Sequence, residues 1–310
     1  MPLLFTCPHC QTQTLVETQY AGQAGACAAC GQPITVPDFQ EETGSIAMEP
    51  RKSIGRPIRL IATICVAAVV VLAGGMLMFR YGVSGIAQIR ANSLRGACRN
   101  NVRLIAAALN AYADDYGTYP TPMVTDAAGK PMYSWRVLIL PYLGHQSLYD
   151  QFNLAEPWSS ETNMALAYSR PAEYGSPAVG SNVWSEPNYM LITGPGTLFP
   201  ASGPLSPRDV IDRPDQTLLV VEVARPANPM AGNELLWTQP ADLDVAKMVP
   251  AINGKDGVEI GGNHEGGATA ATSDGRDHFL SESLSAGEIR GLITPRGGEP
   301  LPDDLLDDWE

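Results

Sequence analysis

The sequence predicts an α+β protein in which a long N-terminal helix packs on an antiparallel β-sheet, with a separate small cysteine-rich module in front. Three features of the 310-residue chain predict this: two Cys-x2-Cys pairs near the start, a long uncharged run after them, and an amphipathic helical stretch followed by β-rich segments. The predicted parts are a cysteine-rich module at 1–37, a linker at 38–59, a transmembrane helix at 60–79, an α+β domain at 85–300 and an acidic tail at 301–310.

The cysteine-rich module has the ligand spacing of a zinc ribbon. Cys7 and Cys10 form the first pair, and Cys27 and Cys30 form the second, with 16 residues between the pairs. Two thiolates in a short knuckle can face one ion, and a second knuckle completes a tetrahedron, so we expect one structural zinc ion. Four thiolates leave no position for a reactive water. The alternative is a pair of disulfides in a secreted module, but no signal peptide precedes the cysteines.

The uncharged run predicts one membrane span. Residues 38–59 are rich in acidic, small and proline residues and have no apolar period, which is typical of a linker. Leu60–Phe79 then contains 20 residues without a formal charge. At about 1.5 Å per residue, a helix of this length crosses a hydrocarbon core of about 30 Å.

The charges beside the span predict its orientation. Four basic residues lie just before it, at Arg51, Lys52, Arg56 and Arg59, whereas only Arg80 and Arg90 lie just after it. The positive-inside rule therefore places the N-terminus in the cytoplasm, where a reducing environment also suits a zinc ribbon. We expect a single-pass protein of the inner (cytoplasmic) membrane with an extracytoplasmic C-terminal domain.

The charge distribution excludes one class of partner. The whole formal net charge of −13 lies on residues 81–310, because the first 80 residues are balanced. Nucleic-acid binding requires basic patches, so we expect no nucleic-acid partner. The chain also lacks a nucleophile elbow and a phosphate-binding loop, and no small-molecule substrate is evident.

An amphipathic helix follows the span. One apolar stripe recurs at steps of three and four, at Cys98, Val102, Ile105, Leu109, Tyr112 and Tyr116. Arg95, Arg99 and Arg103 lie off the stripe and are expected to face water. Gly82 and Gly85 mark the exit from the membrane, and Gly117 and Pro120 should end the helix. A span that leads into such a helix is how a pilin-like protein is built.

The remaining segments predict an antiparallel sheet and a last helix. We expect a short helix or turn at 134–143 and strands at 189–192, 217–223, 268–273 and 276–280. Asp274-Gly275 between the last two strands predicts a type I′ hairpin turn. Ser285 and Glu288 form a capping box for a helix that runs to about Ile293, and the acidic tail should be loose.

Several blocks of the sequence resemble one bacterial family, the domain of unknown function 1559. Residues 98–112, 115–120 and 134–143 are similar to its opening. His264, nine residues and then Asp274-Gly275 are similar to its H-x9-DG signature, and residues 237–243 and 294–299 resemble two further blocks. The resemblance covers about residues 85–300. It implies a prepilin-like, membrane-anchored envelope protein.

The chain departs from this family pattern at two places. The sequence Arg59-Leu-Ile-Ala at the start of the span contains neither a prepilin leader nor a glutamate, which argues against cleavage and filament assembly. Family members often carry a cysteine near Ser169–Pro171, where this chain has Arg170. We therefore expect Cys98 to be a buried thiol without a disulfide partner.

His264 and Asp274, with Glu222 from an apolar strand, are the candidate residues for chemistry in the outer domain. They could form a metal site or an acid–base pair, and His278 could join if its side chain lies on the same face. The alternative, which we favour, is architectural: His264 bonds a neighbouring loop, Asp274-Gly275 makes a turn, and Glu222 pairs with an arginine.

These observations leave three hypotheses for function. The favoured one is a non-enzymatic, pseudopilin-like envelope protein that uses its head for assembly or for binding unknown protein partners. The second is a ligand-binding, sensing or adaptor module that couples the outer domain to a cytoplasmic partner through the ribbon. The third is an envelope enzyme that uses His264, Asp274 and Glu222.

Overall fold

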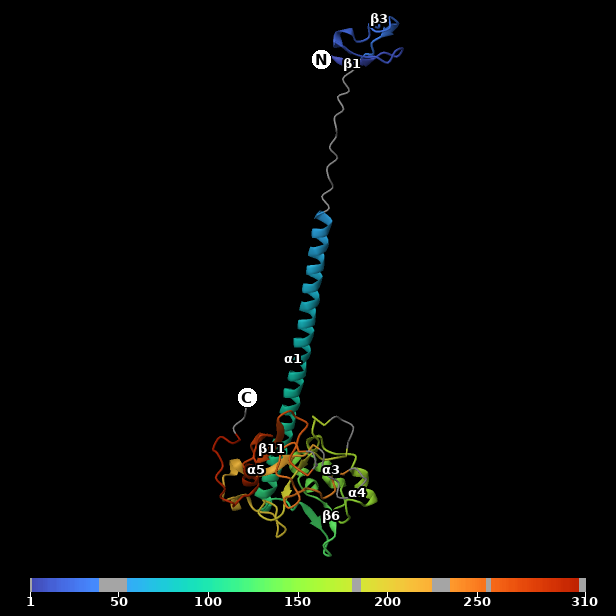
Figure 1. Cartoon of the computed structure of the whole chain (residues 1–310). Helices are drawn as coiled ribbons and strands as arrows, with labels where there is room; N and C mark the ends of the chain where they lie inside the picture. The colour runs from blue at the N-terminus through green and yellow to red at the C-terminus, as the bar shows by residue number, and fades with distance from the viewer. Residues whose placement is uncertain (1, 39–54, 180–184, 225–234, 255–257, 307–310) are drawn as a thin grey trace. The chain divides into compact units, whose positions relative to one another are not determined.

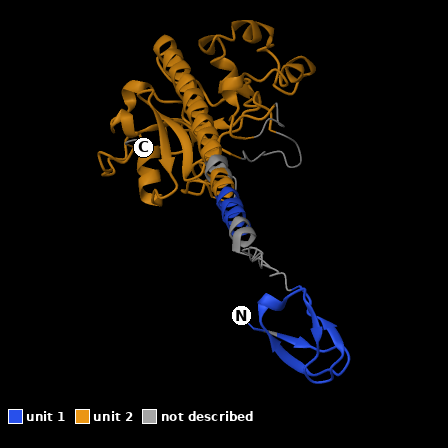
Figure 2. Cartoon of the chain, turned by 90° about the horizontal axis from the view of Figure 1, so that it is seen from above, with its two compact units in different colours: residues 1–73 blue, residues 74–310 orange. Residues whose placement is uncertain are grey.

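The computed structural model describes residues 2–38, 55–179, 185–224, 235–254 and 258–306 of the 310-residue chain (Figure 1). The chain divides into two compact units, residues 1–73 and residues 74–310 (Figure 2). Most of the predicted linker, residues 39–54, lies outside the described residues, as do Arg51 and Lys52 from the predicted basic flank.

The first unit begins with two small antiparallel hairpins. Their strands are β1 (Leu3–Thr6) with β2 (Gln13–Val16) and β3 (Ala24–Ala26) with β4 (Pro33–Thr35), and the 3₁₀ helix η1 (Thr18–Tyr20) lies between the hairpins in sequence. Each hairpin has a Cys-x2-Cys pair in its turn. A module of four strands, each of three or four residues, is too small to bury a hydrophobic core of ordinary size. Its stability therefore has to come largely from another source.

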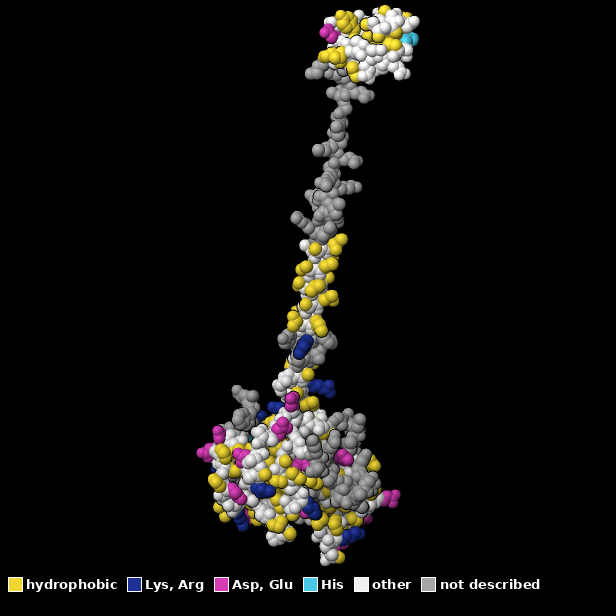
Figure 3. All heavy atoms as spheres, in the orientation of Figure 1, with side chains coloured by type: hydrophobic (Ala, Val, Ile, Leu, Met, Phe, Trp, Pro, Cys, Tyr) yellow, Lys and Arg dark blue, Asp and Glu magenta, His cyan; other side chains and the backbone are white. Residues whose placement is uncertain are grey.

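The helix α1 (Gly55–Tyr116) is continuous for 62 residues. It begins within the predicted linker and continues through Gly82 and Gly85, the two glycines that we expected to mark the exit from the membrane. A glycine within a helix costs only about 1 kcal/mol. Residues 61–78 have a mean hydropathy of 2.5 and are not buried in the fold, and Figure 3 shows their apolar side chains along the helix. By length and composition this segment can cross a membrane.

The second part of α1 packs into the head through the predicted stripe. Its buried positions include Cys98, Val102, Ile105 and Leu109. The stripe ends earlier than predicted, because Tyr116 is 66% exposed and stacks on Tyr112 with ring centroids 4.3 Å apart. Gly117, at φ +84°, ends the helix as predicted and donates its N–H to the Ala113 carbonyl.

Two arginines of α1 contact the sheet, although we expected them to face water. The Arg99 Nε atom lies 2.6 Å from Asp277 Oδ2, and the guanidinium of Arg95 lies 4.0 Å from the ring centroid of Phe279. Both partners belong to β12. The long arginine stems therefore let this edge strand pack beside the helix while their charges stay partly solvated.

The head is built on a four-stranded antiparallel sheet with the order β12-β11-β9-β7. Its strands are β7 (Tyr189–Met190), β9 (Leu218–Glu222), β11 (Gly267–Thr272) and β12 (Asp277–Ser281). One hydrophobic cluster joins α1 to the sheet, and a second joins the sheet to α5 (Ala286–Ile293). Because helices cover both faces, the central strands β9 and β11 are wholly buried and mostly made of apolar or small residues, with Glu222, Thr269 and Thr272 as their polar members.

Shorter elements surround this sheet. They are β5 (Met123–Thr125), β6 (Pro131–Ser134), α2 (Trp135–Leu138), η2 (Pro141–Leu143), α3 (Gln146–Gln151), α4 (Glu161–Leu166), η3 (Ala172–Tyr174), β8 (Ile192–Thr193), η4 (Pro207–Asp209), η5 (Pro214–Gln216) and β10 (Leu243–Asp244). β5 pairs with β6, and β10 pairs in parallel with β8. The predicted short helix at 134–143 and the capping box of Ser285 and Glu288 are confirmed.

The hairpin of β11 and β12 is confirmed, but its turn is not type I′. That turn needs a positive φ at both central residues, and Gly275 has φ +87° whereas Asp274 is not among the described residues with positive φ. Gly275 N–H bonds the Thr272 carbonyl and Thr272 N–H bonds the Arg276 carbonyl. This is the three-residue loop that ends in a left-handed glycine.

The described part of the acidic tail is packed rather than loose. Leu306 is buried in the cluster beside α5, and its carbonyl lies 3.1 Å from His278 Nδ1. Gln216 donates a hydrogen bond to the Pro302 carbonyl. Residues 307–310 lie outside the described part of the chain.

Candidate metal centres

The four cysteines of the ribbon come together at one point. Cys7–Cys10 follows β1 and Cys27–Cys30 follows β3, so each pair occupies the same place in its hairpin. The residue after each pair has a left-handed backbone, with φ 57° at Gln11 and φ 75° at Gly31. In both turns its N–H bonds the carbonyl of the pair's first cysteine, at 2.8 Å. The two knuckles are therefore near copies of one another.

The distances between the sulfur atoms fit a tetrahedral ion. Cys7 Sγ lies 3.9 Å from Cys30 Sγ, Cys10 Sγ lies 3.8 Å from Cys27 Sγ, and all four lie within 4.8 Å of one another. A tetrahedron with metal–sulfur bonds of about 2.3 Å has edges of about 3.8 Å. All four cysteines are free of disulfides. Hydrogen bonding with the Thr12 side chain and backbone lowers the pKa of Cys10 to about 6, whereas, against a hydrogen bond with the Gln32 backbone, desolvation and hydrogen bonds with the other three cysteines raise the pKa of Cys30. The cluster would therefore release a proton when it binds a metal.

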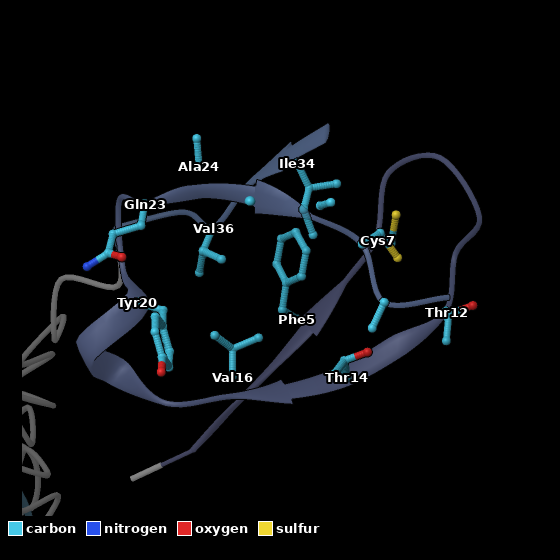
Figure 4. A pocket seen from close by; sticks show the side chains of 14 residues that line it. Phe5, Cys7, Thr12, Thr14, Val16, Tyr20, Gln23, Ala24, Ile34 and Val36 are labelled. Carbon is cyan, nitrogen blue, oxygen red and sulfur yellow. The ribbon is translucent and has the colours of Figure 1, made fainter. Parts of the chain in front are cut away.

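The rest of the ribbon supplies little packing. Phe5, Val16, Tyr20, Ile34 and Val36 point into the space between the hairpins, a pocket of about 390 Å³ (Figure 4). Among these, Val36 alone is buried, and Tyr20 is 49% exposed. A metal ion is therefore the main link that could hold the two hairpins together.

The head brings a second group of metal-ligating side chains together. Cys98 on α1, Glu222 at the end of β9 and His264 before β11 are all buried, and their ligand atoms lie within 4.8 Å of one another. His264 Nε2 is 3.7 Å from Glu222 Oε2. Two of these residues, His264 and Glu222, were in the predicted set. Cys98, which we expected only to be a buried thiol, joins them.

Polar neighbours fix the carboxylate in this group. Glu222 Oε1 accepts a hydrogen bond from Ser176 Oγ at 2.6 Å. Glu222 Oε2 accepts hydrogen bonds from the backbone N–H and the hydroxyl of Thr269, at 3.1 and 2.7 Å. Cys98 Sγ lies 3.2 Å from Ser176 Oγ. Our expectation that Glu222 pairs with an arginine was therefore wrong, since serine and threonine donate these bonds.

Burial shifts the pKa of two of the three side chains toward their neutral forms. Desolvation lowers the pKa of His264, against the opposing effect of the Glu222 charge. Desolvation also raises the pKa of the Cys98 thiol, and the charge of Glu222 adds to this rise. A neutral imidazole is the form that binds a metal ion.

Asp274 does not take part in this group. It lies beyond the opposite end of β11 from His264, and six strand residues span about 20 Å. Its Oδ1 accepts hydrogen bonds from the Thr272 hydroxyl and the Arg276 N–H, which is a turn-making role. His278 bonds Thr272 and the Leu306 carbonyl and is likewise outside the group. The architectural interpretation of Asp274-Gly275 is therefore confirmed, whereas a site that combines His264, Asp274 and Glu222 is not formed.

A polar pocket of about 550 Å³ adjoins His264. Its lining includes Asn253, Glu259, Gly262, Asn263 and Glu265. Glu259 is itself almost wholly buried, and its carboxylate accepts a hydrogen bond from the N–H of Val258. The pocket gives small polar species a route to the loop that carries His264.

One comparison with known proteins identifies part of the chain. Residues 88–197 match the family described as "Protein of unknown function (DUF1559)", so the resemblance inferred from the sequence is confirmed and this segment belongs to that family. The match covers the whole α1 stripe and the segment up to the loop after β8. No curated protein and no solved structure matches the chain.

Proposed function

Starting from a membrane-associated chain with a DUF1559 segment, we propose that this protein is a non-enzymatic, pseudopilin-like envelope protein. In this proposal the span of α1 anchors it once in the cytoplasmic membrane, and the α+β head lies outside for assembly or for binding another protein. The four-cysteine ribbon lies inside and holds one structural zinc ion.

One observation carries this proposal: the single helix α1 has two different surfaces. Its first part exposes apolar side chains over residues 61–78, whereas its second part buries Cys98, Val102, Ile105 and Leu109 in the head. A surface of exposed valine, leucine and isoleucine is costly in water and favourable in lipid. The buried second part makes the helix the central support of the head, so the head would be presented close to the membrane surface.

The ribbon supports the zinc assignment through its donor set. Four thiolates at tetrahedral spacing select zinc or an iron–sulfur centre over calcium or magnesium, which prefer oxygen ligands. The site has no position left for a substrate. We therefore assign it a structural role, which suits docking to a cytoplasmic partner.

Protease protection tests the proposed topology. In sealed bacterial spheroplasts that contain the full-length chain, protease added outside should digest residues 86–306 and leave a protected fragment that contains the ribbon and the span. Permeabilised cells provide the control, because the ribbon should then be digested too. Protection of the head together with loss of the ribbon would contradict the orientation.

A second candidate function, ligand binding by the head, is favoured by the polar pocket beside His264. A small polar metabolite that binds there should raise the thermal unfolding temperature of the purified protein. Asn263→Ala, which alters an exposed wall residue, should reduce that rise. If no metabolite in a broad polar set shifts the wild-type protein, the sensing hypothesis loses its support.

A further inference from the structure

We propose that Cys98, Glu222 and His264 form a second metal site, inside the head, that binds a divalent transition metal of the zinc type. The proposal is independent of the zinc ribbon and of the function proposed above. It rests on three side chains from three separate elements whose sulfur, oxygen and nitrogen atoms converge within 4.8 Å.

The unpartnered imidazole is the observation that points to a ligand. The His264 side chain is 4% exposed, and its Nε2 atom has no hydrogen-bond partner among the residues that the structure describes. The nearest acceptor, Glu222 Oε2, is 3.7 Å away, which is too far for a hydrogen bond. A buried polar atom left in this way costs about 1–3 kcal/mol. A metal ion bound by the imidazole would give Nε2 the partner that it lacks.

Hydrogen bonds already hold the Glu222 carboxylate in one orientation, as is usual for a side chain that binds a metal ion. Its three hydrogen bonds from Ser176 and Thr269 fix the plane of the Glu222 side chain. A carboxylate has about four acceptor positions; Oε2 already accepts two hydrogen bonds and Oε1 accepts one, so the remaining position is on Oε1. Hydrogen bonds to a ligating carboxylate are the usual outer partners of metal ligands.

The loop that carries His264 is held by a strained residue. Asn253 has φ +54°, and its side-chain N–H groups bond the carbonyls of His264 and Gly267 at 3.2 and 3.1 Å. Its Oδ1 accepts a hydrogen bond from Gly262 N–H. Positive φ in a residue other than glycine is uncommon and marks a position that its surroundings over-determine. Asn253 therefore fixes the backbone of the loop from which the imidazole extends.

Gly262, which has no side chain, lies between the buried group of Cys98, Glu222 and His264 and the polar pocket. A Cβ atom at this position would lie 2.7 Å from Glu222 Oε2 and 3.2 Å from His264 Cδ2. Only hydrogen atoms therefore stand between the loop backbone and the two ligands. Because Gly262 and His264 also line the pocket, a metal ion can reach the group by a small movement of this loop.

The donor set selects the class of ion. A thiolate, an imidazole and a carboxylate suit zinc and its neighbours, whereas calcium and magnesium prefer oxygen ligands alone. When the metal binds, the Cys98 thiol loses its proton to solvent and a sulfur–metal bond forms. The two negative ligands then balance the 2+ charge of the ion, which makes the buried complex neutral. Three protein ligands leave a fourth position for water.

An ordinary histidine–glutamate pair in the same head provides the matched comparison. His145 Nε2 lies 3.1 Å from Glu173 Oε2, and both side chains are partly exposed. The two side chains are within hydrogen-bonding distance of each other. Among the described residues, no cysteine lies with them in a group that could hold a metal ion. The buried group differs in having a longer gap between the two side chains, a thiol, and almost no exposure to solvent.

Metal content of the full-length protein in detergent tests the proposal. The variant Cys7→Ala/Cys27→Ala removes two ribbon ligands and should leave one equivalent of Zn²⁺ or Co²⁺ per chain after dialysis. Co²⁺ in that variant should give the charge-transfer absorption of a cobalt–thiolate bond. Adding Cys98→Ser should abolish this absorption, and adding His264→Gln should remove the bound equivalent. Ser176→Ala removes a hydrogen bond to the ligand Glu222 and should weaken metal binding roughly 10–100-fold, as the loss of such a bond to a metal ligand usually does.

Two controls keep the result interpretable. His145→Gln, added to the same ribbon variant, should retain the full equivalent. Circular dichroism of each variant distinguishes loss of metal from loss of folding, and Ser176→Ala reports on the site without removing a ligand. A ribbon variant whose head is folded but that binds no Co²⁺ would overturn the proposal, as would binding that Cys98→Ser and His264→Gln leave unchanged.

Discussion

Removing two ligands from the ribbon should unfold that module and leave the head intact. The perturbation is Cys7→Ala/Cys27→Ala in the full-length chain, because these two cysteines are the buried pair of the four. If zinc binds there, most of its contribution, about 10–16 kcal/mol in comparable modules, is lost.

The remaining contacts of the ribbon are too few to replace that contribution. Besides the two cysteines, Val36 is the only other buried hydrophobic residue among residues 2–38 whose side chains are described, and full burial of such a side chain contributes about 1.5–3 kcal/mol. Ordering each residue of the backbone costs about 1–2 kcal/mol. The metal term is therefore several times larger than the apolar term, and the apo-module should be unfolded.

Hydrogen exchange measured by mass spectrometry provides the assay. In the double variant, peptides from residues 2–37 should exchange as fast as an unstructured chain, whereas peptides from β9 and β11 should keep their wild-type protection. Cys65→Ala is the matched control, since Cys65 is an exposed cysteine of α1 outside the ribbon. Ribbon peptides that keep wild-type protection in the double variant would refute this account of the module.

Three further predictions concern the head. Ser285→Ala removes the α5 cap and should cost about 1 kcal/mol in urea unfolding. Separately, hydrogen bonds with Ser285 lower the pKa of Glu288, so the contribution of the Glu288 carboxylate to stability is present above pH 4.5 and is lost as the pH falls below it. A Glu288→Gln variant that keeps the same pH profile would contradict this. Gly275→Ala places a side chain at φ +87° and should cost about 1–2 kcal/mol without loss of fold, measured by thermal unfolding. Arg136→Met leaves the buried Asp242 without its ion-pair partner, which lies 3.3 Å away, and should cost about 3–5 kcal/mol of unfolding free energy. The double variant Arg136→Met/Asp242→Asn should recover part of that loss. If the losses of the two single variants simply add in the double variant, the two residues do not act as a pair.

Features set by neighbouring residues could be predicted from the sequence. The cysteine spacing predicted that four sulfur atoms meet in one cluster, and the Ser285–Glu288 pair predicted where α5 begins; both are observed. The apolar stripe gave the buried face of α1 from Cys98 to Leu109. The helix signals lie within a few turns and each cysteine pair lies within one hairpin turn, where backbone geometry decides which side chains meet, and the shared affinity for one ion is what links the two pairs.

Features set by strand order could not be predicted in the same way. The contact of Cys98 with the Glu222–His264 pair depends on β9 lying beside β11 and on the rotation of α1 above them. The sequence held partial signals, namely a carboxylate at the end of an apolar strand and a thiol within an apolar stripe. Asp274 was grouped with His264 because the two share a motif, but an extended strand carries them to opposite ends of the sheet.

The buried group in the head is difficult to explain as a device for stability. Replacing buried ionisable side chains by apolar ones of similar size is often neutral or stabilising, so a carboxylate and an imidazole in this position confer no necessary advantage in folding. The Glu222 carboxylate is satisfied by Ser176 and Thr269, yet His264 Nε2 is not satisfied within the described part of the fold. A purely structural histidine would be expected to complete its bonds, as His278 does with Thr272 and the Leu306 carbonyl. The contrast between these two histidines, one in the loop before β11 and one on β12, is the reason to look for a bound ion at His264.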